Sequence, residues 1–199
     1  MLYSMSSRVA ADTRTAILDA ARALFEAEPY TSVGMEAVAK RAGVSRQAIY
    51  LHFASKADLL TALHRRINEL DVEPAMRKVW KCPDALRGLD VFVSSSAQAT
   101  PKILGIFNAL SAAARVEPVA EATFEPPREG RYADCERMAR WLGDDGVLAD
   151  GVSVQEAADV LFTIVSIPAY EMFVLIRGWS PRRWTTWTRR TLQARLLAG

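Results

Sequence analysis

Apolar residues in the first part of the chain recur with the period of an α-helix. In the segment DTRTAILDAARALFEAEPY they lie at Ile17, Ala21, Leu24 and Phe25. This spacing places them on one stripe of an amphipathic helix about four turns long. Pro29 restricts the residue before it to extended conformations, so we expect the helix to end there.

A second, shorter helix is indicated from Met35 to Arg41. Its inner face would consist of Met35, Val38 and Ala39. Gly43 follows, and glycine adopts the positive φ that closes many helix C-termini. We therefore expect the chain to turn sharply at Gly43.

A third helix is expected directly after this turn. Ser45 is placed to cap it, because a serine hydroxyl can accept a hydrogen bond from a free N–H of the first turn. Ile49 and Phe53, four residues apart, would face the core. The residues left on the outside are Arg46, Gln47, Ala48, Tyr50 and His52.

Two helices joined by a short glycine-containing turn, the second of them polar, are typical of a helix-turn-helix that binds the major groove of DNA. Arg46 can bond guanine bidentately, Gln47 can do the same to adenine, and the Ala48 methyl can pack on a thymine methyl. Tyr50 and His52 lie one turn further on, where phosphate contact is favoured over base contact. A plain solvated face with two half-buried aromatic rings would give the same pattern.

The next predicted helix, from Lys56 to about Asp71, offers a phosphate site at its start. Ser55 fits as its N-cap, and a phosphate there would meet the Lys56 ammonium and free backbone N–H groups. Residues 1–66 hold nine Lys or Arg against six Asp or Glu, which gives +3, whereas the remainder holds 16 against 17, which gives −1. The positive charge is thus concentrated where the DNA contacts are predicted.

The run ILDAARALFEAEPYTSVGMEAVAKRAGVSRQAIYLHFASKADLL resembles the DNA-binding domain of the TetR family of bacterial transcriptional regulators. The resemblance extends from about Thr13 to Leu63, with VAKRAGVS, IYLHF and SKADLL in the family's order and spacing. It implies DNA contact by Ser45, Arg46, Gln47, Ala48, Tyr50, His52 and Lys56. Gly34 departs from the family pattern, in which Thr or Ser is more frequent, so phosphate contact from the second helix is in doubt.

Almost every apolar run follows helical spacing, which predicts an all-α fold of about nine helices. The expected domains are a flexible N-terminal arm (1–12), a helix-turn-helix domain (13–55) and a helical effector-binding and dimerisation domain (56–199). Beyond residue 71 the expected helices are Asp84–Gln98, Pro101–Ala114 capped by Thr100, Pro127–Leu142 closed by Gly143, Val154–Arg177 capped by Ser153 and ended by Gly178, and a final helix opened by Ser180 and Pro181. Pro168 is expected to kink the long helix.

The helix predicted from Val154 is apolar on nearly every side beyond Val160, so it needs partners on two sides. One partner can be its own core and the other a second subunit, which predicts a homodimer that resembles the TetR-like arrangement. The predicted interface residues are Phe173, Ile176, Trp184, Trp187, Leu192 and Leu196.

Aromatic and sulfur side chains elsewhere could line an apolar effector pocket, although plain core packing would place them equally well. The candidates are Trp80, Phe92, Phe107, Met138, Trp141, Phe162 and Tyr170.

We do not expect an enzyme, because the two histidines, His52 and His64, have no evident partner and no catalytic motif occurs. Cys82 and Cys135 lack a metal-binding spacing, so neither a metal site nor another cofactor is expected. The first fifteen residues lack the apolar core of a signal peptide, and the apolar run 160–176 is short for a membrane span. We therefore expect a bacterial cytoplasmic protein, located on the nucleoid when bound to DNA.

These patterns together predict a sequence-specific regulator that binds a near-palindromic operator as a homodimer, and the resemblance to the TetR family implies that it is a repressor. A small, largely apolar effector would release it from DNA by favouring a state with wrongly spaced reading heads. The alternative is a TetR-like DNA-binding protein without an effector, which acts through protein contacts or as an architectural factor.

Overall fold

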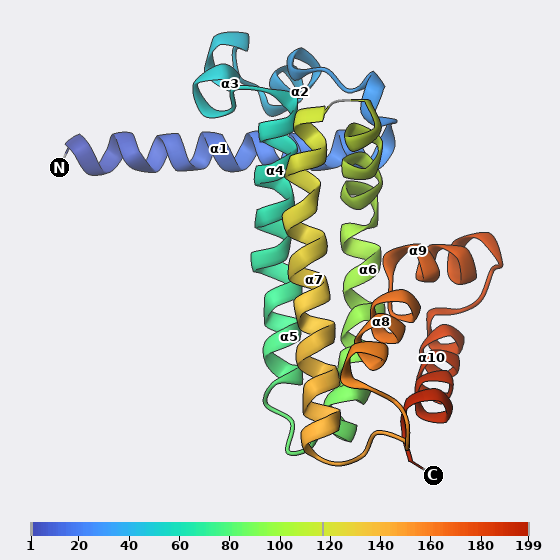
Figure 1. Ribbon diagram of the computed structural model, residues 1–199. Helices are drawn as coiled ribbons and strands as arrows, with labels where there is room; N and C mark the ends of the chain where they lie inside the picture. Colours follow the sequence, from blue (N-terminus) through green and yellow to red (C-terminus); the bar gives the residue numbers. More distant parts are fainter. Residues whose placement is uncertain (1, 117, 199) are drawn as a thin grey trace. The chain divides into compact units, whose positions relative to one another are not determined.

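The computed structural model describes residues 2–116 and 118–198, and the side chains of residues 10–116 and 129–198. Helices dominate it throughout, which confirms the predicted all-α fold (Figure 1). In the described part of the chain no strand forms, and one isolated antiparallel bridge joins Leu148 to Leu197.

The chain forms two compact units. The first, unit 1, consists of Met1–Asn68 and Ile103–Glu125, and the second, unit 2, consists of Glu69–Lys102 and Pro126–Gly199. Helices α6 (Ala85–Val116) and α7 (Pro118–Asp144) contribute residues to both units.

Unit 1 begins with a long helix and continues with three shorter ones. They are α1 (Leu2–Ala27), the 3-10 turn η1 (Tyr30–Ser32), α2 (Met35–Ala42), α3 (Arg46–His52) and α4 (Lys56–Ile67). Helix α1 thus starts well before the stretch that the apolar pattern marks. Helix α4 ends four residues earlier than expected, where the π-helical segment η2 (Asn68–Val72) begins.

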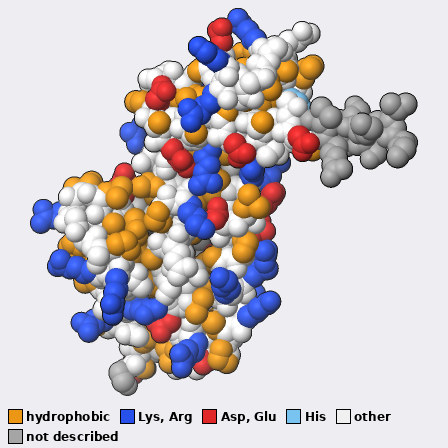
Figure 2. Space-filling view, turned by 180° about the vertical axis from the view of Figure 1, so that it is seen from behind, with side chains coloured by type: hydrophobic (Ala, Val, Ile, Leu, Met, Phe, Trp, Pro, Cys, Tyr) orange, Lys and Arg blue, Asp and Glu red, His pale blue; other side chains and the backbone are white. Residues whose placement is uncertain are grey.

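The remaining helices belong wholly or partly to unit 2. They are α5 (Glu73–Val79), α6 (Ala85–Val116), α7 (Pro118–Asp144), α8 (Val154–Ile164), α9 (Ile167–Tyr170), the π-helical segment η3 (Glu171–Ile176) and α10 (Pro181–Leu196). Hydrophobic side chains fill its core and also gather on an exposed face over the C-terminal helices (Figure 2). The large exposed ones on η3 are Met172, Leu175 and Ile176.

The predicted break before Pro101 is wrong, because α6 runs through it with Pro101 inside the helix. Thr100 does not cap a helix. It is buried, and its hydroxyl donates to the carbonyl of Ser96 at 2.8 Å. Proline removes one backbone donor from a helix, and here the helix continues despite that loss.

Helix α7 is longer at both ends than predicted, since it begins at Pro118 instead of Pro127 and includes Gly143. Gly146, with φ of +67°, closes it instead. The N–H of Val147 donates to the carbonyl of Leu142 at 3.0 Å, the backbone bond expected of a glycine-terminated helix.

The single long helix predicted from Val154 to Arg177 is also wrong. Helix α8 ends at Ile164 and a new helix starts at Ile167, bent by 46°. Ser166 caps the new helix by accepting from the N–H of Ala169 at 3.0 Å. Pro168 therefore lies in the first turn of α9, where its missing N–H costs nothing, and not in a mid-helix kink.

In the described residues no single helix is long and apolar enough to cross a membrane. The bent pair Val154–Ile164 and Ile167–Ile176 reaches that length and composition only when its two parts are taken together.

Candidate nucleic-acid interface

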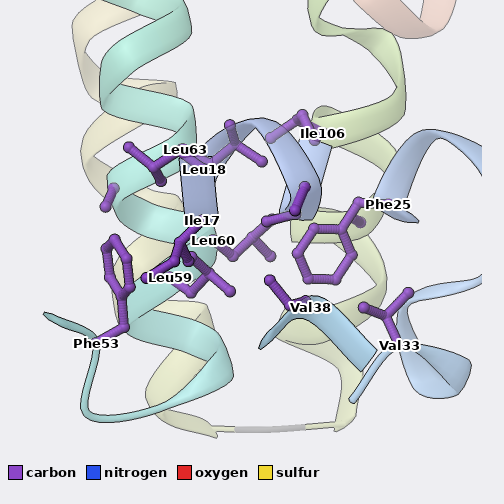
Figure 3. Packing of buried hydrophobic residues seen from close by; sticks show 14 of the residues in the cluster. Ile17, Leu18, Phe25, Val33, Val38, Phe53, Leu59, Leu60, Leu63 and Ile106 are labelled. Carbon is purple, nitrogen blue, oxygen red and sulfur yellow. The ribbon is translucent and has the colours of Figure 1, made fainter. Parts of the chain in front are cut away.

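The orientation of α3 is fixed by its buried face and by its N-cap. Ile49 is fully buried, and Phe53 packs in one cluster with Ile17, Leu59 and Leu60 (Figure 3). The Ser45 hydroxyl accepts from the N–H of Ala48 at 3.0 Å, as predicted. With one face anchored, the opposite face of the helix must point to solvent.

The turn before α3 has the predicted geometry. Gly43 adopts a φ of +70°, and the N–H of Val44 donates to the carbonyl of Ala39 at 3.0 Å. A side chain with a Cβ would be strained at that φ, so the glycine directly sets how α3 leaves α2.

The exposed face of α3 carries the predicted base-reading side chains. Arg46 and Gln47 are exposed, and Ala48 is half-buried beside them. All three lie in the first turn, which in a helix-turn-helix contacts base edges. Their hydrogen-bonding groups are thus presented on one rigid element.

The second half of α3 is less polar than predicted. Tyr50 is 47% exposed, whereas His52 is half-buried with its ring 6.4 Å from that of Phe53. Leu51 is 81% exposed and was not among the predicted contacts. The position of Leu51 between the outward residues Tyr50 and His52 in IYLHF could have indicated its exposure. Its side chain suits contact with a thymine methyl or a sugar.

Lys56 is held in place by a residue that the sequence analysis missed. Its ammonium donates to the carbonyl of Tyr30 at 3.0 Å and lies 3.8 Å from the centre of the Tyr30 ring. Tyr30 is itself buried and stacks on Phe25 at 6.0 Å. The cation–π contact therefore fixes the charge at the start of α4.

The N-terminus of α4 is partly satisfied from within the chain. The Ser55 hydroxyl accepts from the N–H of Asp58 at 3.0 Å, and the Asp58 carboxylate accepts from the N–H of Ala54 at 3.0 Å. A phosphate at this end would meet Lys56 but also the negative charge of Asp58. The lysine is therefore a better candidate for phosphate contact than the backbone N–H groups expected from the sequence.

Further exposed cations belong to unit 1. Lys40 and Arg41 lie in the last turn of α2, and the guanidinium of Arg14 lies 5.1 Å from the centre of the Phe53 ring. Gly34 caps α2 without a side-chain hydrogen bond, in agreement with its lack of a hydroxyl.

Most predicted effector-pocket residues meet in the core of unit 2. Phe107 is the exception, because it packs on the core of unit 1. Its predicted place beside the other six residues is therefore wrong. The other six are in contact with one hydrophobic cluster and comprise Trp80, Phe92, Met138, Trp141, Phe162 and Tyr170. Two surface hollows in the described part of the chain are lined by other residues, one of them beside α10 and the other between α6 and α10.

The predicted dimer-interface residues divide into two groups. Trp184, Leu192 and Leu196 are fully buried in their own chain, so their predicted contact with a second subunit is wrong. Phe173 and Trp187 are half-buried, and Ile176 is 71% exposed. Trp184, Leu192 and Leu196 of α10 thus face the core of their own chain. The large exposed apolar side chains near the C-terminus lie on η3.

Residues 17–63 match the family model of bacterial regulatory proteins of the tetR family. The regulator AcrR of Shigella flexneri is 41% identical over 68 residues, which cover 32% of this chain and 32% of that protein. The match thus spans about a third of the length of that relative.

Two solved structures share the fold of nearly the whole chain. A Saccharomonospora viridis protein in complex with choline has a TM-score of 0.80 at 18% identity and covers 95% of this chain and 100% of its own. The regulator FadR of Bacillus subtilis in complex with stearoyl-CoA has a TM-score of 0.70 at 17% identity and covers 89% and 96%.

Proposed function

Since the chain belongs, through residues 17–63, to the TetR family of bacterial regulatory proteins, we propose that it is a sequence-specific DNA-binding transcriptional regulator. The observation that supports this most is the exposed first turn of α3. Arg46 and Gln47 project from a helix whose other face is anchored by Ile49 and whose start is capped by Ser45.

In this proposal the first turn of α3 reads bases and the flanking residues bind the backbone. Arg46 bonds O6 and N7 of a guanine, Gln47 bonds an adenine, and Ala48 packs on a thymine methyl. Tyr50 and Lys56 bind phosphates and so set the register. His52 is placed at the edge of this contact because it is half-buried.

We further propose that the protein acts as a homodimer on a near-palindromic operator. The exposed Met172, Leu175 and Ile176 of η3 form an apolar surface suited to a self-complementary contact, together with half-buried Phe173 and Trp187. Two recognition helices about 34–36 Å apart would then read successive major grooves.

Unit 2 is proposed to bind a small, largely apolar effector that releases a repressor from DNA. Solved proteins of the same fold hold choline and stearoyl-CoA, which supports a ligand-binding role for this unit. The alternative, a DNA-binding protein without an effector, is favoured by the tight packing of Phe92 and Met138 in the unit 2 core.

Selection from a pool of random duplexes tests the proposal. The purified protein should enrich a near-palindrome, and its affinity for that sequence should fall with rising salt as counterions are released. Enrichment of no sequence, with only salt-labile binding to any duplex, would reject a sequence-specific regulator.

A further inference from the structure

Arg14 of α1 is an exposed cation of unit 1 to which the proposed function gives no role. Its guanidinium lies 5.1 Å from the centre of the Phe53 ring. Phe53 is 1% exposed and is the C-cap residue of α3, and it packs in the core cluster drawn in Figure 3. Arg14 is therefore held beside the C-terminal end of α3.

The same kind of contact holds Lys56, which the proposed function already assigns to a phosphate. The Lys56 ammonium lies 3.8 Å from the centre of the buried Tyr30 ring. In both pairs a buried aromatic ring attracts a cation to its face and so limits the freedom of a long side chain. For an arginine, stacking on a ring leaves the N–H groups at the edge of the guanidinium available to an acceptor.

Two other arginines on or against α1 are engaged in ion pairs. Arg22 of α1 lies 2.8 Å from Glu26, and Arg66 of α4 lies 2.9 Å from Asp19. Among the described residues no carboxylate forms an ion pair with Arg14. The charge of Arg14 is therefore available to an anion from outside the chain.

The region around α3 is rich in cations and needs one more at its C-terminal end. Between Glu36 and Asp58 the chain has four Lys or Arg and no Asp or Glu, and Asp58 itself accepts from the N–H of Ala54 at 3.0 Å. The last carbonyl groups of a helix carry partial negative charge, so a phosphate near the exposed Tyr50 requires a cation close by. The last turn of α3 offers only the half-buried His52 and no lysine or arginine.

We propose that Arg14 binds a phosphate of the DNA backbone beside the C-terminal end of α3. Its guanidinium forms charge-assisted hydrogen bonds to the phosphate oxygens. Because phosphates carry no sequence information, Arg14 sets the position of the protein on the duplex and not its base preference. The inference rests on the proposed binding to DNA, and it adds a contact from α1, a helix that the proposed function does not use.

A brace for the Phe53 ring is the alternative role of the same side chain. In that role the packing of the arginine on the ring matters, and its charge does not. Arg14→Leu keeps an apolar contact with the ring and removes the charge. Arg14→Lys keeps the charge and removes the planar group. The two substitutions therefore separate a phosphate contact from a brace.

The salt dependence of duplex binding tests the proposal in the full chain. A duplex of random sequence is the probe, because a phosphate contact needs no specific site. Arg14→Leu should reduce the slope of log K against log salt concentration by about 0.9, the value for one phosphate contact. Arg14→Lys should keep most of the native slope. On a selected duplex, Arg14→Leu should weaken binding and leave every base preference unchanged.

Arg22→Leu is the matched control, because it removes the same charge from the same helix at a position paired with Glu26. It should leave the slope unchanged. Urea unfolding of each variant shows that it is folded under the conditions of the binding measurement.

A native slope in Arg14→Leu would overturn the proposal, and a lowered unfolding midpoint beside that slope would assign Arg14 to bracing Phe53. An equal reduction of the slope in Arg22→Leu would also overturn it, because net charge alone would then explain the effect.

Failure of the proposed regulator gives a different result. If no sequence is enriched and Arg14→Leu still reduces the slope on random duplexes, sequence-specific regulation is rejected and the phosphate contact stands. If the chain binds no duplex at any salt concentration, both are rejected.

Discussion

The two units differ in how far local sequence controls their structure. In unit 1 the helices around the candidate interface are short, and each end has its own signal, as at Gly43, Ser45 and Ser55. Unit 2 also has local caps, as at Ser166 and Ser180, but it includes much of the long helices α6 and α7, and Pro101 does not break α6. Short capped helices fix the direction of the side chains between their caps, whereas long helices leave the facing of a side chain to tertiary contacts.

The largest expected effect is a difference in the free energy of unfolding between substitutions on the buried and on the more exposed side of α10. Trp184 is fully buried with its ring 5.1 Å from that of Tyr170, so Trp184→Ala should lower the free energy of unfolding by about 3–5 kcal/mol. Trp187→Ala, at a half-buried position of the same helix, should cost clearly less. Urea denaturation of both variants measures the difference.

Trp184→Phe sharpens this comparison. The indole N–H of Trp184 is buried without a hydrogen-bond partner among the described residues, so a phenyl ring keeps most of the packing and removes an unsatisfied donor. A loss as large as that of Trp184→Ala would contradict this expectation, because a phenyl ring would then recover none of the packing of the indole.

The next largest effect is a difference in stability between alanine substitutions at two glycines of unit 1. Gly43→Ala should destabilise by about 1–2 kcal/mol, because an alanine is strained at a φ of +70°. Gly34→Ala should change the free energy of unfolding by less than about 1 kcal/mol in either direction, because the gain at a φ of −106° with open space at the Cβ is opposed by the poorer capping of α2 by alanine. Equal thermal-unfolding shifts for both variants would contradict the assigned role of Gly43 in the turn.

The smallest effect concerns pH and is expected in unit 1. Burial lowers the pKa of His64 below its ordinary value of 6.5, so the unfolded chain binds a proton that the folded chain excludes. The free energy of unfolding should therefore fall as pH drops below 6.5, until the folded pKa is reached. His64→Gln should remove this part of the pH dependence, as measured by urea unfolding from above pH 6.5 to about pH 5.

The caps and turns of the fold could be predicted because each depends on a few adjacent residues. Gly43, Ser45, Gly178 and Ser180 all have the conformation or hydrogen bond that their types suggest. The two prolines could not be placed in the same way. Pro101 lies inside a helix, whereas Pro168 lies in the first turn of a helix that Ser166 caps, although a possible capping residue precedes both prolines.

The candidate site shows the same limit. Arg46 and Gln47 could be placed on the exposed face from the spacing of Ile49 and Phe53 alone. The contact of Lys56 with Tyr30 joins residues 26 positions apart and left no signal in the pattern. The base-reading roles and the domain limits 1–12, 13–55 and 56–199 stay predictions.

The most direct test of the proposed reading face combines Arg46→Ala with every single base substitution in a selected duplex. We expect the variant to lose discrimination of about 1–3 kcal/mol at one base pair per half-site and to keep its preferences elsewhere. Lys56→Ala should instead weaken all sequences alike and reduce the salt dependence. A uniform loss of affinity for Arg46→Ala, with every base preference retained, would contradict the account.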